Sequence, residues 1–149
     1  MSAVVKESLY DQDFYAWINK QVDLLRAKKF NEIDLEHLSE EIEDMGKSEK
    51  RSLRNHLVRL IQHLLKWEYQ PERRGRSWEL TIKAQRQAVR ELLLESPSLK
   101  HKLPEIIDQA YVSAIYEACA EINTKTESDF PEKCIYTFDM LLDNDFWPQ

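Results

Sequence analysis

The most strongly periodic segment of this chain is residues 53–65, which read Leu53-Arg54-Asn55-His56-Leu57-Val58-Arg59-Leu60-Ile61-Gln62-His63-Leu64-Leu65. Its leucines and isoleucine recur at three- and four-residue steps, a spacing that places them on one face of an α-helix. We therefore expect a long central helix that supplies much of the core. This helix should end near Tyr69, because Pro71 disfavours helical geometry at Gln70 and has no backbone N–H to donate.

The residues before this segment predict two further stretches of helix. Residues 14–30 carry apolar side chains at helical spacing, and residues 35–45 do so again after Asp34. The Asp34 carboxylate can cap the second stretch by accepting an orphan backbone N–H. A glycine inside a helix costs about 1 kcal/mol relative to alanine. We therefore expect a break near Gly46, with the next helix beginning at Ser48.

The residues after the central helix also read as helices joined by short connections. Ser77 can cap a helix that continues to Ser96-Pro97, and Pro104 can open a longer one. A short helix is expected from Thr137 to Asp143. The tail Phe146-Trp147-Pro148 is too apolar to remain in water, so we expect it to dock on the helices.

These elements predict an all-α fold, an up-and-down helical bundle of about five to six helices with a break near Gly46 and a docked C-terminal tail. The composition agrees, since 42% of the residues are hydrophobic and 32% charged, with only two Gly and five Pro. The length of 149 residues is expected to form one domain over residues 1–149, with residues 1–9 flexible.

Charge is sorted into three blocks along the chain. Residues 1–50 hold 7 Lys or Arg against 12 Asp or Glu, residues 51–102 hold 12 against 5, and residues 103–149 hold 2 against 10. A basic block between acidic flanks can pair with those flanks or present an anion-binding surface. We expect pairing, with several arginines within about 4 Å of a carboxylate.

The strongest candidate for a binding site is the loop and helix start at residues 67–78. Its arginines precede a predicted helix N-terminus, which favours anions, and its aromatic rings can stack on a base. The candidate residues are Arg73, Arg74, Arg76, Ser77, Trp67, Tyr69 and Trp78. The competing interpretation is that the arginines form internal ion pairs and the aromatic residues belong to the core.

Three histidines are weaker candidates for a metal site. His56 and His63 share a helix face, and His37 shares another with nearby carboxylates. No Glu-x-x-His pair of the kind used by di-iron bundles occurs, and such histidines more often form hydrogen bonds between helices. We therefore assign no metal and no cofactor.

No sequence motif indicates catalysis. The chain has no glycine-rich phosphate loop, no nucleophile elbow and no spaced triad, so an enzyme is disfavoured. The longest aliphatic run, Leu92-Leu93-Leu94, is far shorter than the roughly 20 residues that span a bilayer, so no membrane association is expected. Met1 to Asp13 lacks the apolar stretch of a secretory signal, which makes the cytoplasm the expected compartment.

The chain also resembles a known family in several stretches that keep their order and spacing. The first are Asp13-Phe14-Tyr15-Ala16-Trp17, Leu38-Ser39-Glu40-Glu41-Ile42-Glu43-Asp44-Met45-Gly46, His63-Leu64-Leu65-Lys66-Trp67-Glu68-Tyr69-Gln70-Pro71 and Ser77-Trp78. The last are Phe130-Pro131-Glu132-Lys133-Cys134 and Leu141-Leu142-Asp143-Asn144-Asp145-Phe146-Trp147-Pro148. They are similar to the bacterial family called domain of unknown function 29, DUF29. The resemblance implies an all-helical bundle and implies no activity and no site residues.

The sequence therefore leaves function open between classes of binding protein. The favoured interpretation is a small cytoplasmic helical bundle that acts as a protein-interaction module with an unknown protein partner. The alternative is the binding of nucleic acid or a phosphorylated ligand through the basic loop at residues 67–78. A metal-dependent enzyme ranks third, and the oligomeric state is left open.

Overall fold

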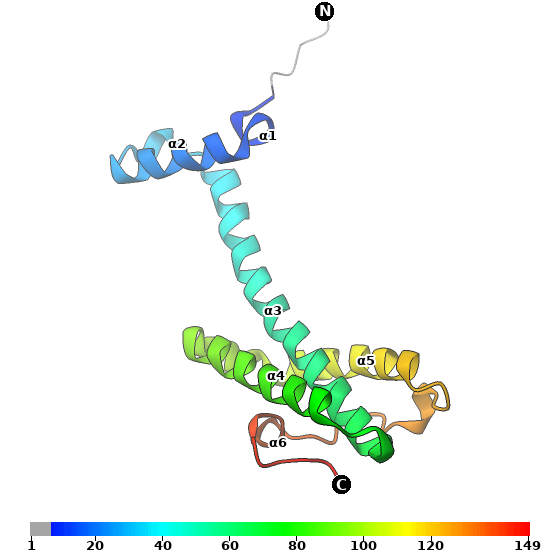
Figure 1. Ribbon diagram of the computed structural model, residues 1–149. Helices are drawn as coiled ribbons and strands as arrows, with labels where there is room; N and C mark the ends of the chain where they lie inside the picture. The colour runs from blue at the N-terminus through cyan, green and yellow to red at the C-terminus, as the bar shows by residue number, and fades with distance from the viewer. Residues whose placement is uncertain (1–6) are drawn as a thin grey trace, which may run out of the picture. The chain divides into compact units, whose positions relative to one another are not determined.

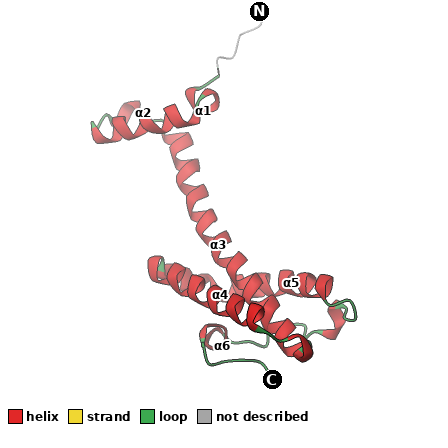
Figure 2. Ribbon diagram, in the orientation of Figure 1, coloured by secondary structure: helices red, strands yellow, loops and turns green. Residues whose placement is uncertain are grey.

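The computed structural model describes residues 7–149, and every regular element in that range is a helix (Figures 1 and 2). The predicted all-α fold is confirmed. Contacts divide the chain into two compact units, Met1–Lys47 and Ser48–Gln149, called here the N-terminal and C-terminal units. The single domain over residues 1–149 stays a prediction. The flexibility predicted for residues 1–9 falls mainly outside the described residues, and a helix begins at Leu9.

The N-terminal unit consists of short helices and the first turns of a long one. Its elements are α1 (Leu9–Gln12), α2 (Phe14–Arg26), the 3-10 turn η1 (Phe30–Glu32) and the beginning of α3 (Leu35–Tyr69). Asp13 caps α2 by accepting a hydrogen bond from the backbone N–H of Ala16 at 3.0 Å. The chain then turns at Lys28, whose φ of 58° is in the left-handed region, and returns toward α2.

Asp34 fixes the start of α3 against α2. One carboxylate oxygen accepts from the backbone N–H of His37 at 3.3 Å, which is the predicted cap. The other accepts from Trp17 Nε1 at 3.0 Å and pairs with His37 Nδ1 at 2.7 Å. The backbone N–H of Asp34 donates to Gln21 Oε1 at 2.8 Å. Trp17 and Gln21 are buried, while the side chains of His37 and Asp34 are 27% and 32% exposed, so the cluster is partly open to solvent.

The predicted break near Gly46 is wrong, because α3 runs through this residue without interruption. A Cβ placed on Gly46 would meet no atom within 4 Å, so no neighbouring contact forces the backbone out of helical geometry. The cost of one glycine is about 1 kcal/mol, which a helix of 35 residues with strong helix formers on both sides can absorb. The boundary between the two units nevertheless falls one residue later, after Lys47.

The C-terminal unit is built on the second half of α3. Its other elements are η2 (Pro71–Arg73), α4 (Arg76–Glu95), η3 (Pro97–Lys102), α5 (Leu103–Glu121), η4 (Glu127–Asp129) and α6 (Phe138–Leu142). The predicted core stripe is confirmed, since its six members are completely buried: Leu53, Leu57, Leu60, Ile61, Leu64 and Leu65. They pack with Ile82 and Val89 of α4 and with Ile106 and Ala110 of α5.

Two arginines of α4 hold the C-terminal end of α6. Arg86 is completely buried and donates from Nε to Leu141 O at 2.8 Å and from Nη2 to Phe146 O at 2.8 Å and Met140 O at 3.2 Å. Arg90 donates to the carbonyl of Leu142. The last carbonyls of a helix have no intrahelical partner and carry partial negative charge, so cations are favoured there.

The predicted docking of the C-terminal tail is confirmed. Phe146 and Trp147 pack against the hydrophobic core, and Pro148 is buried. The Trp147 ring lies 4.7 Å from that of Trp67, and the Arg86 guanidinium lies 5.5 Å from the Trp147 ring. The tail is therefore fixed both by apolar burial and by the α4 arginines.

The predicted pairing of arginines with carboxylates is wrong. Within residues 7–149 the ion pairs are His37 with Asp34, Lys47 with Glu43, Lys66 with Glu121 and Lys83 with Glu79. Arginines in the basic block instead donate to backbone carbonyls, as Arg86 and Arg90 do. A guanidinium has five donors in a fixed fork, so one side chain can bind several carbonyls of a chain terminus.

No helix in the described part of the chain is long and apolar enough to cross a membrane.

Replacing Leu64 by alanine should destabilise the C-terminal unit by roughly 2–5 kcal/mol, because the change removes buried surface and leaves a cavity. The measurement is urea unfolding followed by circular dichroism. Leu94→Ala is the matched control, since Leu94 is 80% exposed and its truncation should change stability little. Equal effects of the two changes would contradict the assignment of Leu64 to the core.

Replacing Arg86 by methionine keeps most of the side-chain volume and removes its hydrogen bonds to three carbonyls. We expect a loss of roughly 2–4 kcal/mol and faster amide hydrogen exchange in residues 138–148, since hydrogen bonds to charged groups contribute about 1.5–3 kcal/mol each. Lys83→Met is the control, because the Lys83 ion pair with Glu79 is exposed. Unchanged exchange in the tail would show that apolar packing alone holds it.

Candidate functional site

In the basic loop predicted as an anion site, one arginine, Arg74, is bonded to backbone carbonyls of the chain itself. Arg74 donates from Nε to Trp67 O at 2.6 Å and from Nη2 to Pro148 O at 3.3 Å. Its guanidinium also lies 5.3 Å from the centre of the Trp67 ring. Arg74 therefore joins the end of α3 to the tail, while Arg73 and Arg76 are exposed.

The predicted cap at Ser77 is wrong, because α4 begins at Arg76 with Gly75 as its N-cap residue. No side chain caps this helix, and Ser77 lies in its first turn, where its carbonyl accepts a hydrogen bond from Thr81 Oγ1 at 3.0 Å. Glycine is itself a common N-cap residue, which the sequence interpretation passed over in favour of serine.

The three aromatic residues of the loop contact the chain itself. The Trp67 ring meets that of Trp147, and Tyr69 packs edge-on against Phe130 at 4.8 Å between ring centres. Lys66 Nζ lies 4.7 Å from the Trp78 ring. Trp67 and Tyr69 pack against the hydrophobic core, as the competing interpretation expects, whereas binding of an anion by the loop stays a prediction.

The three candidate histidines lie in three separate places. His56 Nδ1 lies 2.6 Å from Gln85 Oε1 and joins α3 to α4, as expected for an interhelical hydrogen bond. His37 pairs with Asp34, and His63 Nδ1 lies 2.9 Å from the carbonyl oxygen of Arg59. Among residues 7–149, no group of three or more His, Cys, Asp or Glu side chains has the arrangement of a metal site.

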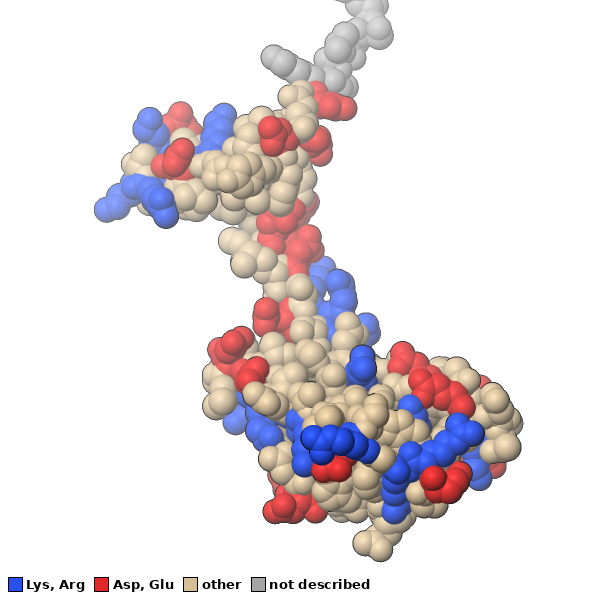
Figure 3. All heavy atoms as spheres, viewed as in Figure 1, with Lys and Arg blue, Asp and Glu red and all other residues tan. Residues whose placement is uncertain are grey.

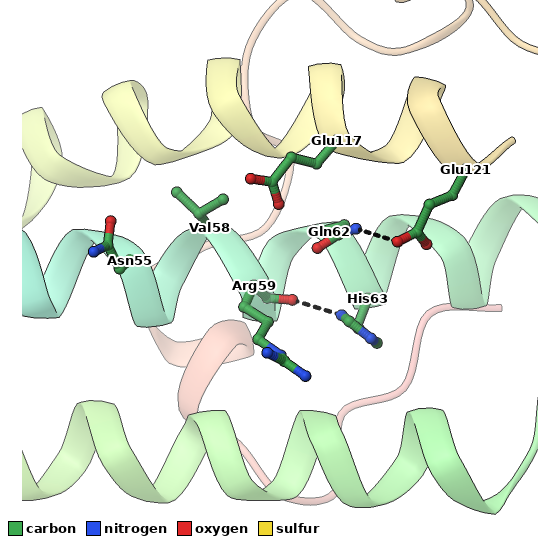
Figure 4. A pocket seen from close by; sticks show the side chains of 7 residues that line it. All are labelled: Asn55, Val58, Arg59, Gln62, His63, Glu117 and Glu121. Carbon is green, nitrogen blue, oxygen red and sulfur yellow. Dashed lines mark hydrogen bonds between the residues drawn. The ribbon is translucent and has the colours of Figure 1, made fainter.

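His63 also lines a polar cleft in the C-terminal unit, with a volume of about 470 Å³ (Figure 4). Its other lining residues are Asn55, Val58, Arg59 and Gln62 of α3 and Glu117 and Glu121 of α5. We call this the polar cleft. The sequence interpretation found His63 but missed Glu117 and Glu121. Their i, i+4 spacing next to the small residues Ala114 and Ala118 is the signal that they share the α5 face turned toward α3.

The floor of the polar cleft consists of polar side chains that are almost fully buried. His63 is 9% exposed and Gln62 is 6% exposed. Gln62 Nε2 donates to Glu121 Oε1 at 3.2 Å, and Glu121 also forms a close ion pair with Lys66. Because the Arg59 carbonyl can only accept, Nδ1 of His63 is the donor in their hydrogen bond. Burial lowers the pKa of His63, and the nearby Lys66 and Arg59 charges lower it further.

The N-terminal unit contains a second concave surface, an apolar groove of about 340 Å³ between α2 and α3. Its lining residues are Phe14, Trp17, Ile18, Gln21, Val22 and Leu25 of α2 and Leu38, Glu41, Ile42 and Met45 of α3. We call this the apolar groove. The apolar stripe predicted over residues 35–45 is present on α3, but the described residues leave it open to solvent, with Ile42 60% and Met45 67% exposed.

Acidic side chains are frequent on the part of α3 that contributes to the apolar groove, and one of them, Glu41, lines it. Residues 36–44 include five carboxylates and no Lys or Arg, and acidic atoms gather over this part of α3 in Figure 3. Glu41 lines the groove and accepts a hydrogen bond from the Tyr10 hydroxyl. The groove therefore combines an apolar lining with one carboxylate, that of Glu41.

The family model for the domain of unknown function DUF29 matches residues 9–147. The chain belongs to the DUF29 family. Searches of curated proteins and of solved structures found no match. The two concave surfaces described above come from the geometry of this chain alone.

Two histidines of this DUF29 chain, His37 and His63, should have pKa values shifted in opposite directions from the usual value of about 6.5. The hydrogen bond to Asp34 raises the pKa of His37, whereas burial lowers the pKa of His63. The stability that His37 contributes is present below about pH 6.5 and is lost as the pH rises through its folded pKa. His63 reduces stability as the pH falls from about 6.5 through its own folded pKa.

The measurement is an NMR titration of the histidine rings. Asp34→Asn should bring the midpoint of His37 back toward 6.5 and leave that of His63 unchanged, while asparagine still caps α3. A His37 midpoint that does not move in this variant would contradict the assigned cause.

Proposed function

We propose that the chain is a protein-interaction module and that its apolar groove binds an amphipathic helix of a partner protein, one that carries Lys or Arg beside its apolar face. The single observation that carries the proposal is an open apolar groove with one lining carboxylate, that of Glu41. Helix-in-groove binding is a common mode of peptide recognition, and it uses apolar anchors at i, i+3, i+4 and i+7.

The apolar lining of the groove supports the proposal because α2 and α3 leave part of their apolar faces exposed. Phe14, Ile42 and Met45 line the groove and are each more than one third exposed. Scattered apolar residues are normal on a surface, but these share one concave site. Methionine is also frequent in grooves that bind helices, since its flexible thioether adapts to different side chains.

Charge supports a basic partner over a second copy of the same unit. Residues 1–47 hold 6 Lys or Arg against 11 Asp or Glu, a net charge of −5. Two such units would bring like charges together, whereas a basic helix would meet Glu41 in a unit of net negative charge. Charge of this kind mainly sets specificity and association rate, while burial of the apolar face supplies affinity.

A fluorescent peptide of Leu and Lys, with Leu at i, i+3, i+4 and i+7, tests the proposal by anisotropy with the full chain. The same peptide with Glu in place of Lys should bind much more weakly. Ile42→Gln and Met45→Gln should each weaken binding of the Lys peptide roughly tenfold, because burying such a side chain contributes about 1.5–3 kcal/mol. Leu94→Gln is the control, since Leu94 is an exposed leucine of the C-terminal unit.

Equal affinity of the Lys and Glu peptides would contradict the charge assignment. Binding that survives both groove variants would place the peptide elsewhere. Sedimentation that shows a dimer of the free chain, abolished by Ile42→Gln, would assign the groove to a second copy.

Nucleic acid or a phosphorylated ligand at residues 67–78 is the second candidate. Arg73 and Arg76 are exposed beside the start of α4, whose first N–H groups have no side-chain cap. This candidate has less support, because the Arg74 guanidinium is bonded to two carbonyls of the chain.

A further inference from the structure

A further concave surface of the C-terminal unit is a small pocket of about 270 Å³ beside α4. Figure 1 shows α6 next to α4 in this unit. The lining residues are Arg90, Leu93 and Leu94 of α4, Lys100 of η3, and Phe138 and Leu142 of α6. Two of them are cations, and no carboxylate of the described residues lines the pocket. We call this the cationic pocket.

The other four lining residues are apolar and leave hydrocarbon surface uncovered. Leu93 belongs to the core and is 4% exposed, whereas Leu94 beside it is 80% exposed. Phe138 and Leu142 are partly buried and pack against the core. A ligand with a hydrocarbon chain would cover these side chains, and their removal from water would supply affinity.

The two cations of the pocket have N–H donors available for an anion. Within residues 7–149, neither Arg90 nor Lys100 has a carboxylate oxygen within 4.0 Å. Arg90 donates from Nη2 to Asn144 Oδ1 at 3.0 Å and to the Leu142 carbonyl, which leaves Nε and Nη1 without a described acceptor. Both atoms are accessible to solvent, because Arg86 Nη1 is the one buried side-chain nitrogen or oxygen of these residues without a partner.

The ligand that complements this pocket joins a hydrocarbon chain to an anionic group. A carboxylate accepts charge-assisted hydrogen bonds from both guanidinium and ammonium groups. A methylene group is close in size to a water molecule, whose share of liquid volume is about 30 Å³, so about 270 Å³ holds a chain of roughly eight carbons.

We propose that the cationic pocket binds a free medium-chain fatty acid of about eight carbons. Its carboxylate meets Arg90 and Lys100, and its acyl chain covers Leu93 and Leu94. The site is separate from the apolar groove, where the carboxylate of Glu41 would repel a fatty acid. It does not depend on the proposed binding of a helix.

The test is calorimetric titration of the full chain with octanoate, below the concentration at which octanoate forms micelles. We expect saturable binding at one site. Octylammonium has the same chain with the opposite charge and should bind at least roughly tenfold more weakly. Butanoate keeps the carboxylate on a shorter chain, and it should also bind at least roughly tenfold more weakly because it covers less apolar surface.

Variants at two exposed lining residues separate the charge from the apolar lining. Lys100→Gln should weaken octanoate binding roughly tenfold, and Lys102→Gln is its matched control, because Lys102 is exposed on the same 3-10 helix outside the pocket. Leu94→Ala should weaken binding roughly threefold or more. Leu80→Ala is its control, since Leu80 is an exposed leucine of α4 that does not line the pocket. All four side chains are exposed, so the free variants should keep the melting temperature of the original chain.

Four results would overturn the proposal. The first is no saturable binding of octanoate, and the second is equal affinity for octanoate and octylammonium. The third is octanoate binding that Lys100→Gln leaves unchanged. The fourth is binding that Ile42→Gln abolishes, which would place the acyl chain in the apolar groove.

Discussion

Removal of Leu53, Leu57 and Leu64 from water is the constraint on which the C-terminal unit depends. These side chains are completely buried because α4 and α5 pack on the second half of α3. Burying a leucine contributes about 1.5–3 kcal/mol, so the stripe outweighs any single polar contact in the unit. The first half of the same helix has an apolar stripe too, but the described residues of its unit leave that stripe partly uncovered, so Ile42 and Met45 stay exposed and a groove remains.

The features that could be predicted from sequence depend on neighbours in the chain. The stripe over residues 53–65, the cap at Asp34 and the apolar tail each express local periodicity or a hydrogen bond over three residues. The predicted break at Gly46 was wrong because it rested on one residue alone. A single glycine lowers helix stability by a small amount. Whether a long helix continues is decided by the summed helix propensity of all its residues.

The polar cleft was harder to predict because it depends on residues far apart in the sequence. His63 was a candidate from its helix face, but Glu117 and Glu121 come from α5, more than fifty positions later, and no local pattern joins them to His63. The arginines were assigned to carboxylates because opposite charges attract in any arrangement. Their actual partners, the carbonyls of Leu141 and Pro148, become acceptors only once the tail has folded back.

Arg86 illustrates how one buried charge specifies the position of the tail. Its Nε and Nη2 are satisfied by three carbonyls, while Nη1 is the one buried side-chain nitrogen or oxygen in the described chain without a partner. Burial lowers the pKa of this guanidinium, although arginine stays protonated at any ordinary pH. The guanidinium stays charged while it is buried, so displacement of the tail would leave the charge without its acceptors, at a large cost in free energy. Apolar contacts lose less free energy when they shift. The apolar rings of Phe146 and Trp147 favour docking in general, and the arginine selects the one docked arrangement in which its carbonyl acceptors are in reach.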